Sequence, residues 1–309
     1  MADILKLSPT FKDYIWGSNK LKKEYDVSGM ERVAEAWVLS AHPDGPSYLS
    51  DGRSFIDELN TMGLSALGEK YKNFTEFPQL IKLIDAQNDL SVQVHPSDEY
   101  ALAHEGQFGK TEMWYILEAE EGAGIYYGFE RDVTCEEVKS HICDNTLVDL
   151  LRFIPVKRGE CYFIPAGTVH AIGKGLLIAE IQQNSNVTYR LYDYGRKDAA
   201  GNTRPLHIDK ALAVMNLSRS AKQSQGRTLS VKGSTFTEIA ECPYFRVEKM
   251  TVTDTITFAD ESAFASLLIL SGEGTINGQP FERYDAFFIP ANSGKVTLVG
   301  CFEALLSRL

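Results

Sequence analysis

One short segment of the chain has residue types that backbone geometry dictates. It reads Gly159-Glu-Cys-Tyr-Phe-Ile-Pro165-Ala-Gly167-Thr-Val-His170. The run from Cys161 to Ile164 fits an apolar β-strand, and the Pro-x-Gly that follows fits a tight turn, because proline fixes φ and glycine adopts positive φ freely. A histidine comes directly after the turn. The segment therefore predicts a strand whose following turn presents an imidazole.

Two other segments carry side chains that can bind a metal. Gln93 and His95 are separated by one residue, and side chains alternate along a strand, so both are expected on one face. Glu112 lies in a third strand-like run, residues 111–117. Together with His170 these residues offer two imidazoles, a carboxylate and an amide oxygen, a donor set that suits one divalent metal ion.

The charge and composition of the chain exclude several classes of protein. A formal net charge of −11 argues against nonspecific binding to nucleic acid or to an anionic membrane. A phosphorylated substrate would therefore need a local positive pocket. The N-terminus has no basic stretch followed by an apolar core, and the apolar runs are shorter than a membrane span. The five cysteines form no C-x-x-C pair, so we expect reduced thiols and a cytoplasmic location.

At 309 residues the chain is long enough for two domains. The apolar residues of 54–84 approach a helical period and predict a small helical insert between strand-like regions. A polar stretch rich in Ser, Lys, Gln and Gly, residues 218–234, predicts a linker, and only strands are expected after it. We expect a mainly β chain with an N-terminal domain at 1–217 that carries the site and a C-terminal domain at 235–309.

A weak internal repeat relates the two halves. Each half has an apolar strand before a glycine-rich turn, and a second strand that ends in Phe-Ile-Pro-Ala. These stretches are 113–117 and 162–166 in the first half, and 267–270 and 287–291 in the second. The second copy, for which separate strands are expected at 265–270 and 274–277, has Asn292-Ser-Gly-Lys295 in place of the ligand-bearing turn and no histidine. The repeat predicts two related β-barrels, of which only the first holds a metal.

Gly159-x5-Pro165-x-Gly167-x2-His170 matches the second motif of the cupin superfamily, and Gln93-x-His95 with Glu112 resembles the first. Glutamine replaces the usual first histidine of that motif, and a helical insert lengthens the gap to the glutamate. Within the superfamily the chain resembles the type I phosphomannose isomerases, which are zinc-dependent, in their short bacterial form. The blocks that carry the resemblance are 91–98, 109–114, 167–171 and 180–190. The resemblance spans the whole chain and implies two cupin-like barrels of the jelly-roll type.

In this family zinc is held by a glutamine, a histidine, a glutamate and a second histidine. These positions fall on Gln93, His95, Glu112 and His170, which implies one Zn²⁺ per chain. Any one of these side chains, taken alone, could simply be hydrogen-bonded beside a strand. Gln93 could instead bind substrate or orient a water, because a neutral amide is the weakest ligand of the four.

The resemblance also implies three active-site residues outside the ligand set. Lys110 lies two residues before Glu112, so a strand would project both to the same side; the family places a substrate-binding lysine here, and the alternative is a solvated lysine at the rim. Glu180 and Arg190 match the active-site glutamate and arginine of the family. A guanidinium suits a phosphate because it donates two hydrogen bonds at once, although Arg190 could instead form an ordinary ion pair.

The function that the resemblance implies is the interconversion of mannose 6-phosphate and fructose 6-phosphate through a cis-enediol. The reaction needs a metal that stabilises the enediolate charge and a base that moves a proton between neighbouring carbons, a role open between Glu180 and Lys110. Two alternatives are an iron-dependent cupin oxygenase and a non-catalytic sugar-binding bicupin. Lys110 with Arg190 favours an anionic sugar phosphate over the first. A complete ligand set in one half alone favours catalysis over the second.

Overall fold

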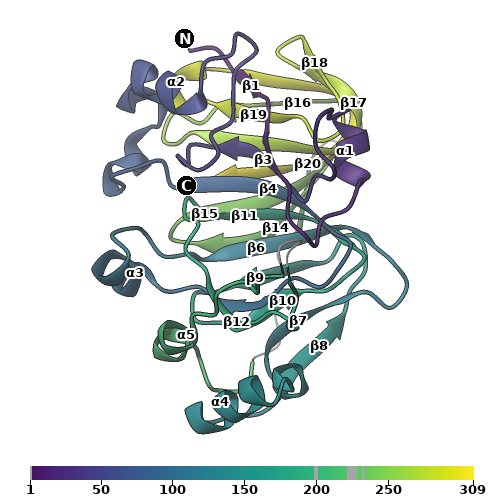
Figure 1. The fold of residues 1–309 in the computed structure, drawn as a ribbon. Helices are drawn as coiled ribbons and strands as arrows, with labels where there is room; N and C mark the ends of the chain where they lie inside the picture. Colours follow the sequence, from purple (N-terminus) through teal and green to yellow (C-terminus); the bar gives the residue numbers. More distant parts are fainter. Residues whose placement is uncertain (1, 198–200, 221–227, 232–233) are drawn as a thin grey trace. The chain divides into compact units, whose positions relative to one another are not determined.

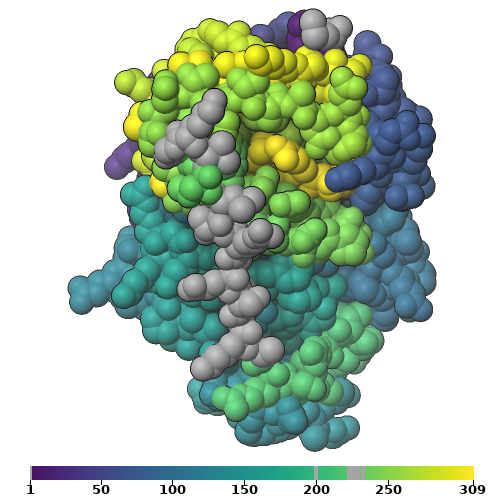
Figure 2. Space-filling view, turned by 180° about the vertical axis from the view of Figure 1, so that it is seen from behind, coloured from purple at the N-terminus to yellow at the C-terminus, as the bar shows by residue number. Residues whose placement is uncertain are grey.

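The computed structural model describes residues 2–197, 201–220, 228–231 and 234–309, which fold mainly into strands. They divide into two compact units, both discontinuous in sequence: unit 1 is Met1–Thr10, Trp37–Lys82 and Ser224–Leu309, and unit 2 is Phe11–Ala36 and Leu83–Gln223. Within unit 1 the blue segment 37–82 lies beside the green-to-yellow C-terminal strands (Figures 1 and 2). The division at 1–217 and 235–309 stays a prediction. About half of the expected linker at 218–234 lies outside the described residues, and 228–231 form a strand.

Unit 1 contains a nine-stranded sheet in which every pairing is antiparallel. The sheet runs in the order β1-β19-β17-β20-β15-β14-β13, with β16 paired to β20 and β18 to β17. Its strands are β1 (Leu5–Leu7), β13 (Thr228–Val231), β14 (Ser234–Cys242), β15 (Phe245–Val252), β16 (Thr255–Phe258), β17 (Ala265–Ile276), β18 (Gln279–Phe281), β19 (Ala286–Ile289) and β20 (Val296–Arg308).

The expectation of two separate strands at 265–270 and 274–277 is wrong, because β17 runs through both. Its register against β20 shifts between Ile269 and Ser271. Gly272 has a φ of 85°, and a Cβ there would lie 2.1 Å from the carbonyl oxygen of Cys301. A bulge with a glycine bends a strand without ending its pairing. The glycine-rich turn seen in the sequence is therefore a bend within one long strand.

Unit 2 contains a five-stranded sheet, ordered β12-β5-β10-β7-β8. Its strands are β5 (Val92–Val94), β7 (Gly124–Phe129), β8 (Leu151–Pro155), β10 (His170–Ile172) and β12 (Tyr189–Tyr192). A third sheet has six strands in the order β2-β3-β4-β11-β6-β9. These are β2 (Thr10–Lys12), β3 (Glu35–Ser40), β4 (Gln79–Ala86), β6 (Glu112–Ala119), β9 (Cys161–Ile164) and β11 (Leu176–Gln183).

The helices are short, and none in the described ranges is long and apolar enough to cross a membrane. The expected insert at 54–84 is helical only as far as Asn73; from Gln79 it is strand. Thr134 caps the helix that follows it, because its side chain accepts a hydrogen bond from the amide of Glu137. The helices are α1 (Lys20–Glu24), α2 (Phe55–Met62), α3 (Asp98–His104), α4 (Cys135–Cys143) and α5 (Ile208–Val214), with 3₁₀ turns at Leu64–Ala66, Glu69–Asn73, Leu147–Leu150 and Ala291–Ser293.

The five-stranded sheet has one apolar and one polar face at the level of the site. On the apolar face alternate residues of β5, β10 and β12 pack with α4 and α5 in one core cluster; they are Val92, Val94, Ala171, Tyr189 and Leu191. Because side chains alternate along a strand, the residues between them project to the opposite face. Those residues are Gln93, His170 and Arg190, and they stand opposite one another in the register of β12, β5 and β10.

This opposite face looks onto β6, β9 and β11 of the six-stranded sheet. Farther along the strands the space between the two sheets is filled by apolar side chains, among them Ile116, Ile125, Ile172 and Ile178. The interior thus changes from apolar to polar along the strand direction. The expected mainly β, jelly-roll type of architecture is confirmed, although none of the sheets closes into a complete hydrogen-bonded barrel within the described residues.

Candidate active site

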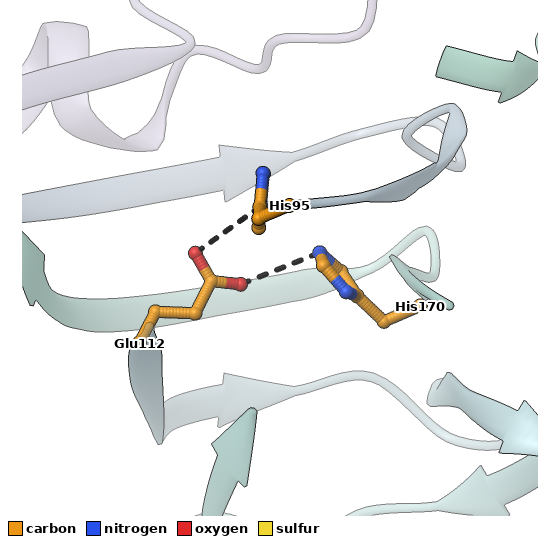
Figure 3. A group of neighbouring side chains, drawn as sticks. All are labelled: His95, Glu112 and His170. Carbon is orange, nitrogen blue, oxygen red and sulfur yellow. Dashed lines mark ion pairs between the residues drawn. The ribbon is translucent and has the colours of Figure 1, made fainter. Parts of the chain in front are cut away.

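Three of the four ligand candidates converge within unit 2, between the five-stranded sheet and strand β6 of the six-stranded sheet. His95 directly follows β5, His170 begins β10, and Glu112 begins β6 on the facing sheet. All three are buried, and one ligand atom of each lies within 4.8 Å of the others. The carboxylate of Glu112 faces both rings, with Oε2 3.5 Å from His95 Nε2 and Oε1 3.4 Å from His170 Nε2 (Figure 3).

Backbone carbonyls fix which ring nitrogen of each histidine carries the proton. His95 Nδ1 lies 2.9 Å from the carbonyl oxygen of Val187, and His170 Nδ1 lies 2.8 Å from that of Thr168. A carbonyl oxygen can only accept a hydrogen bond, so each Nδ1 is the donor. In the neutral ring Nε2 then holds a lone pair, and both lone pairs point at the cluster.

The donor set fits a divalent metal. Burial lowers the pKa of His170 from 6.5 to about 4, the Lys110 ammonium contributing, so the ring is neutral near pH 7. The neutral Nε2 of His170, the Nε2 of His95 and the carboxylate of Glu112 face one point, where a cation would contact all three. A carbonyl-held Nδ1–H is also how proteins orient histidines that bind a metal. Within the described ranges no other group of three or more His, Cys, Asp or Glu side chains meets in this way.

Gln93 reaches the same cluster. Its Nε2 lies 3.3 Å from His170 Nε2, and the two residues are paired across β5 and β10. The nitrogen and oxygen of an amide are assigned from the hydrogen-bond network. A half-turn of the amide about its last side-chain bond puts the oxygen at the same place, where it could face a metal.

The Pro-x-Gly turn of the segment 159–170 supports the site in two ways. Gly167 has a φ of 86°, as a Pro-x-Gly turn requires, and its amide donates to the carbonyl oxygen of His95 at 2.8 Å. The next residue, Thr168, supplies the carbonyl that holds the ring of His170. One turn therefore joins the two histidine segments and orients one of the rings.

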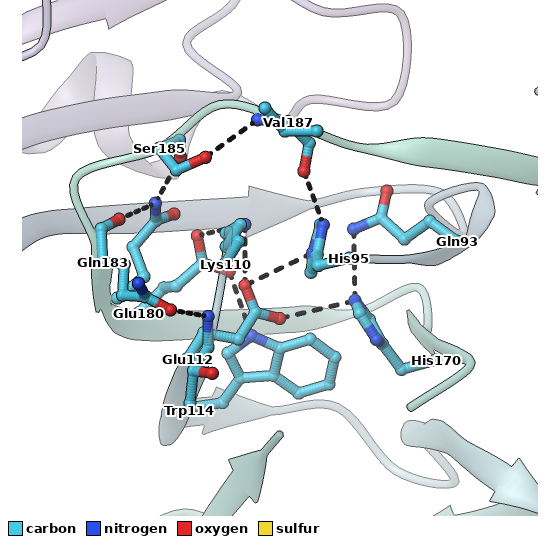
Figure 4. A network of polar contacts seen from close by, with 12 residues as sticks. Gln93, His95, Lys110, Glu112, Trp114, His170, Glu180, Gln183, Ser185 and Val187 are labelled. Atoms are coloured by element: carbon cyan, nitrogen blue, oxygen red, sulfur yellow. Dashed lines mark hydrogen bonds and ion pairs between the residues drawn. The ribbon is translucent and has the colours of Figure 1, made fainter. Parts of the chain in front are cut away.

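A buried charged network adjoins the ligands (Figure 4). Lys110 Nζ lies 2.6 Å from Glu112 Oε2 and 3.3 Å from Glu180 Oε1, and the lysine is only 5 % exposed. The alternative of a solvated rim lysine is therefore wrong. Burial alone would lower the pKa of Lys110, but the charges of Glu112 and Glu180 outweigh it and raise the pKa above its usual range. Lys110 is thus a fixed cation between two carboxylates.

Arg190 lies on the polar face of the five-stranded sheet, in register with Gln93. Its Nε donates to Ser91 Oγ at 3.3 Å, and its Nη1 donates to the carbonyl oxygen of Pro205 at 3.0 Å. Among the described residues it forms no ion pair with a carboxylate, so the ordinary ion pair considered for it is not found. Burial lowers its pKa, and the neighbouring charges of Arg204 and Arg196 add to that effect.

Sequence reasoning missed one side chain that touches the site. Trp114, fully buried on β6, donates from its indole Nε1 to Glu180 Oε2 at 3.0 Å. The signal was present, since Lys110, Glu112 and Trp114 are spaced by two and an extended chain directs all three to one side. The carbonyls of Val187 and Thr168 carry no such signal, because every residue type has one.

The family models that match the chain cover both of its ends. Residues 4–122 match "Phosphomannose isomerase type I, catalytic domain" and residues 235–309 match "Mannose-6-phosphate isomerase, cupin domain". The second match contains β17, β19 and β20, the strands of the second repeat copy.

Individual relatives match along nearly the full chain. The mannose-6-phosphate isomerase ManA of Bacillus subtilis is 37 % identical over 316 aligned positions, covering 99 % of this chain and 98 % of the relative. The mannose-6-phosphate isomerase of Streptococcus mutans is 40 % identical over 89 % of this chain and 87 % of its own. A crystal structure of the mannose 6-phosphate isomerase from Bacillus subtilis superposes with a TM-score of 0.91 at 34 % identity and covers 100 % of both chains.

Proposed function

The chain belongs to the type I phosphomannose isomerase family, and from this premise we infer that it is an aldose–ketose isomerase that interconverts mannose 6-phosphate and fructose 6-phosphate. The observation that carries the inference is the buried cluster of His95, Glu112 and His170 in a chain that matches these isomerases from end to end. The sugar phosphate is thus the proposed partner of the site.

We propose that the site holds one Zn²⁺ per chain. His95, Glu112 and His170 would supply two nitrogens and one oxygen, and the amide oxygen of Gln93 would complete a four-coordinate set. The oriented Nε2 lone pairs and the adjacent amide support this assignment. Bound there, the ion would stabilise negative charge that develops on the substrate oxygens.

The proton transfer is assigned to Glu180. The reaction takes a proton from C2 of the aldose and returns it to C1, so the group involved must accept and then release it. Lys110 is held protonated by its two carboxylate neighbours, and a charged ammonium cannot accept a proton. This favours Glu180 as the base. Lys110 would then hold both carboxylates in place and place positive charge beside the cis-enediol.

Arg190 is proposed to contact the phosphate of the substrate. It lies on the same face of the sheet as Gln93 and His170 and is not committed to a carboxylate among the described residues. Arg196 and Arg204 also lie beside β12, where Asp193 pairs with both, so these side chains together with Arg190 carry a net positive charge. A chain with a net charge of −11 needs such a region to attract a dianionic sugar phosphate.

The two alternative functions are less well supported. An iron-dependent oxygenase would use the two histidines and Glu112, but it would not require Lys110 and Glu180 beside them. A non-catalytic sugar-binding protein would not require a ligand set joined to a buried lysine–carboxylate network. We propose a cytoplasmic location on the basis of the five cysteines, all of which are free thiols.

The test is an assay on protein of measured metal content. Formation of fructose 6-phosphate from mannose 6-phosphate should scale with zinc occupancy, disappear after chelation and return on adding Zn²⁺. The ferrous form should consume no oxygen in the presence of substrate. Substrate binding without turnover at full zinc occupancy would support the sugar-binding alternative instead.

A further inference from the structure

The side chain of Trp114 touches both His170, a proposed metal ligand, and Glu180, the proposed base. It stands opposite Glu180 in the register of β6 and β11, and its indole N–H donates to Glu180 Oε2 at 3.0 Å. The ring lies edge-on to the imidazole of His170, with centroids 5.3 Å apart and planes at 77°. Trp114 and Glu180 are both buried, so neither is positioned by bulk water.

The carboxylate of Glu180 is held by two different donors on the adjacent strand segment. Lys110 lies at Oε1 and Trp114 at Oε2 (Figure 4). The last torsion of a glutamate is broad, so without donors the carboxylate plane would rotate easily. An indole N–H is only ever a donor, so this contact keeps its direction when Glu180 interacts with substrate.

Packing alone does not require an indole at this position. In the second copy of the repeat, the strands β17 and β20 have Leu267 opposite Leu306, where β6 and β11 have Trp114 opposite Glu180. Both leucines are buried in the apolar core of unit 1. The second repeat copy has no group of metal-binding side chains among the described residues, and there two leucines fill the place of Trp114 and Glu180.

We propose that Trp114 is a positioning residue for the isomerisation: its indole N–H holds the carboxylate of Glu180 in the orientation that reaches the substrate carbons. The inference rests on the proposed role of Glu180. Proton transfer depends steeply on the geometry of donor and acceptor, so a carboxylate that rotates freely is expected to lower turnover more than substrate binding.

The first experiment compares Trp114→Phe with Trp16→Phe. Phenylalanine keeps an aromatic ring against His170 and removes the N–H. Trp16 is a matched control because it is a buried tryptophan of the same core cluster, stacked on Tyr14. Trp114→Phe should lower kcat by about 10- to 100-fold, the usual effect of losing a hydrogen bond to a charged group. KM and zinc content should stay within about twofold, and Trp16→Phe should keep native kcat.

The second experiment tests whether Trp114 acts through Glu180. Trp114→Phe is combined with Glu180→Gln, and the two effects on kcat should not add, because the hydrogen bond has no function once the base is lost. Additive losses would overturn the inference and indicate a general structural effect. An isostere with sulfur in place of the indole N–H, benzothienylalanine at position 114, gives the same test if Trp114→Phe folds poorly.

The outcomes separate the inference from the function on which it rests. If Glu180→Gln keeps native turnover, Glu180 is not the base and the proposed mechanism fails first. If Glu180→Gln is inactive while both the phenylalanine variant and the isostere turn over normally, the mechanism stands and the role of Trp114 is overturned. Loss of zinc with loss of activity in both Trp114 variants would also overturn it, because the tryptophan would then be supporting His170.

Discussion

The two copies of the internal repeat have the same strand pairing but different interiors. In unit 2, β6 pairs with β9 so that Glu112 stands opposite Ile164; in unit 1, β17 pairs with β19 so that Ala265 stands opposite Ile289. Both pairs are antiparallel, and in both the second strand ends in Phe-Ile and is followed by Pro-Ala. The residue that supplies a carboxylate in one copy is an alanine in the other.

The difference extends over the whole site. Position by position, Lys110 corresponds to Ala263, Trp114 to Leu267 and Glu180 to Leu306. His170, five residues after Pro165, corresponds to Lys295, five residues after Pro290. Ala263, Leu267 and Leu306 are buried, whereas Lys295 is exposed.

This comparison shows which residues the architecture needs and which the chemistry needs. A strand pair of this kind folds with an apolar interior, so the buried charges of unit 2 are not required for strand pairing. Burying a charge without partners is costly, and the copy that keeps such charges has them paired with one another. The polar interior is therefore best explained by function.

The largest expected effect comes from replacing His170, whose imidazole distinguishes the first repeat copy from the second. His170→Ala should lose the metal and all measurable isomerase activity together, because water replaces a neutral nitrogen ligand poorly. Lys295→Ala, at the corresponding position of unit 1, should keep both. Elemental analysis and the coupled assay on the same samples check this. Two metals per chain in the native protein, or activity in a metal-free sample, would contradict the one-site comparison.

The second prediction concerns Glu180, whose counterpart is Leu306. Glu180→Gln should keep zinc and bind mannose 6-phosphate, but turnover should fall by about two to four orders of magnitude, because the amide cannot accept the C2 proton. Exchange of that proton with solvent, followed by NMR, separates base loss from misfolding. Exchange at the native rate in this variant would transfer the role to Lys110 or another group.

The sequence predicts strands best where backbone geometry restricts residue choice. The strand expected at Cys161–Ile164 has the same limits in the structure, and Pro165 explains where it ends. β17 was split in two, because in a sequence a glycine that ends a strand cannot be told from one that bends it. Motif spacing predicts the three side chains that converge, His95, Glu112 and His170, and Gln93 beside them. The carbonyls that fix the histidine tautomers depend on how loops fold back, which spacing does not encode.

A third prediction tests whether Arg190, in the positively charged region beside β12, binds the phosphate of the substrate. Arg190→Lys keeps the charge but loses the fork of donors, so kcat on mannose 6-phosphate should fall by about 10- to 100-fold. Unphosphorylated mannose, if turned over, should be affected much less. Arg152→Lys on β8 of the same sheet is the matched control and should be native. An equal loss on both sugars would place Arg190 at the reacting carbons, and native kinetics with a lower Tm would make it structural.

The smallest expected effect is a pH dependence of stability in metal-free protein, which arises from buried His170, where the second repeat copy has the exposed Lys295. Burial lowers the pKa of His170 in the folded chain to about 4, against 6.5 when it is solvated. Between these values the unfolded chain binds a proton that the folded chain does not. The free energy of unfolding therefore rises with pH across this window, and the stability is lost as the pH falls from 6.5 towards 4.

The size of this pH effect is set by the single proton that His170 binds in the unfolded chain. Well inside the window each pH unit changes the free energy of unfolding by about 1.4 kcal/mol, and at pH 6.5 by about half of that. Metal-free protein should therefore lose about 1.6 kcal/mol between pH 6.5 and pH 5 through His170. Urea titrations at several pH values measure this. His170→Gln cannot take up the proton and should remove that part of the dependence, whereas His104→Gln, at an exposed histidine on α3, should keep it. If the wild type and His170→Gln gave the same slope, the imidazole would not be held neutral by burial. The contrast between the polar interior of the first repeat copy and the apolar interior of the second would then have no effect on how the chain responds to acid.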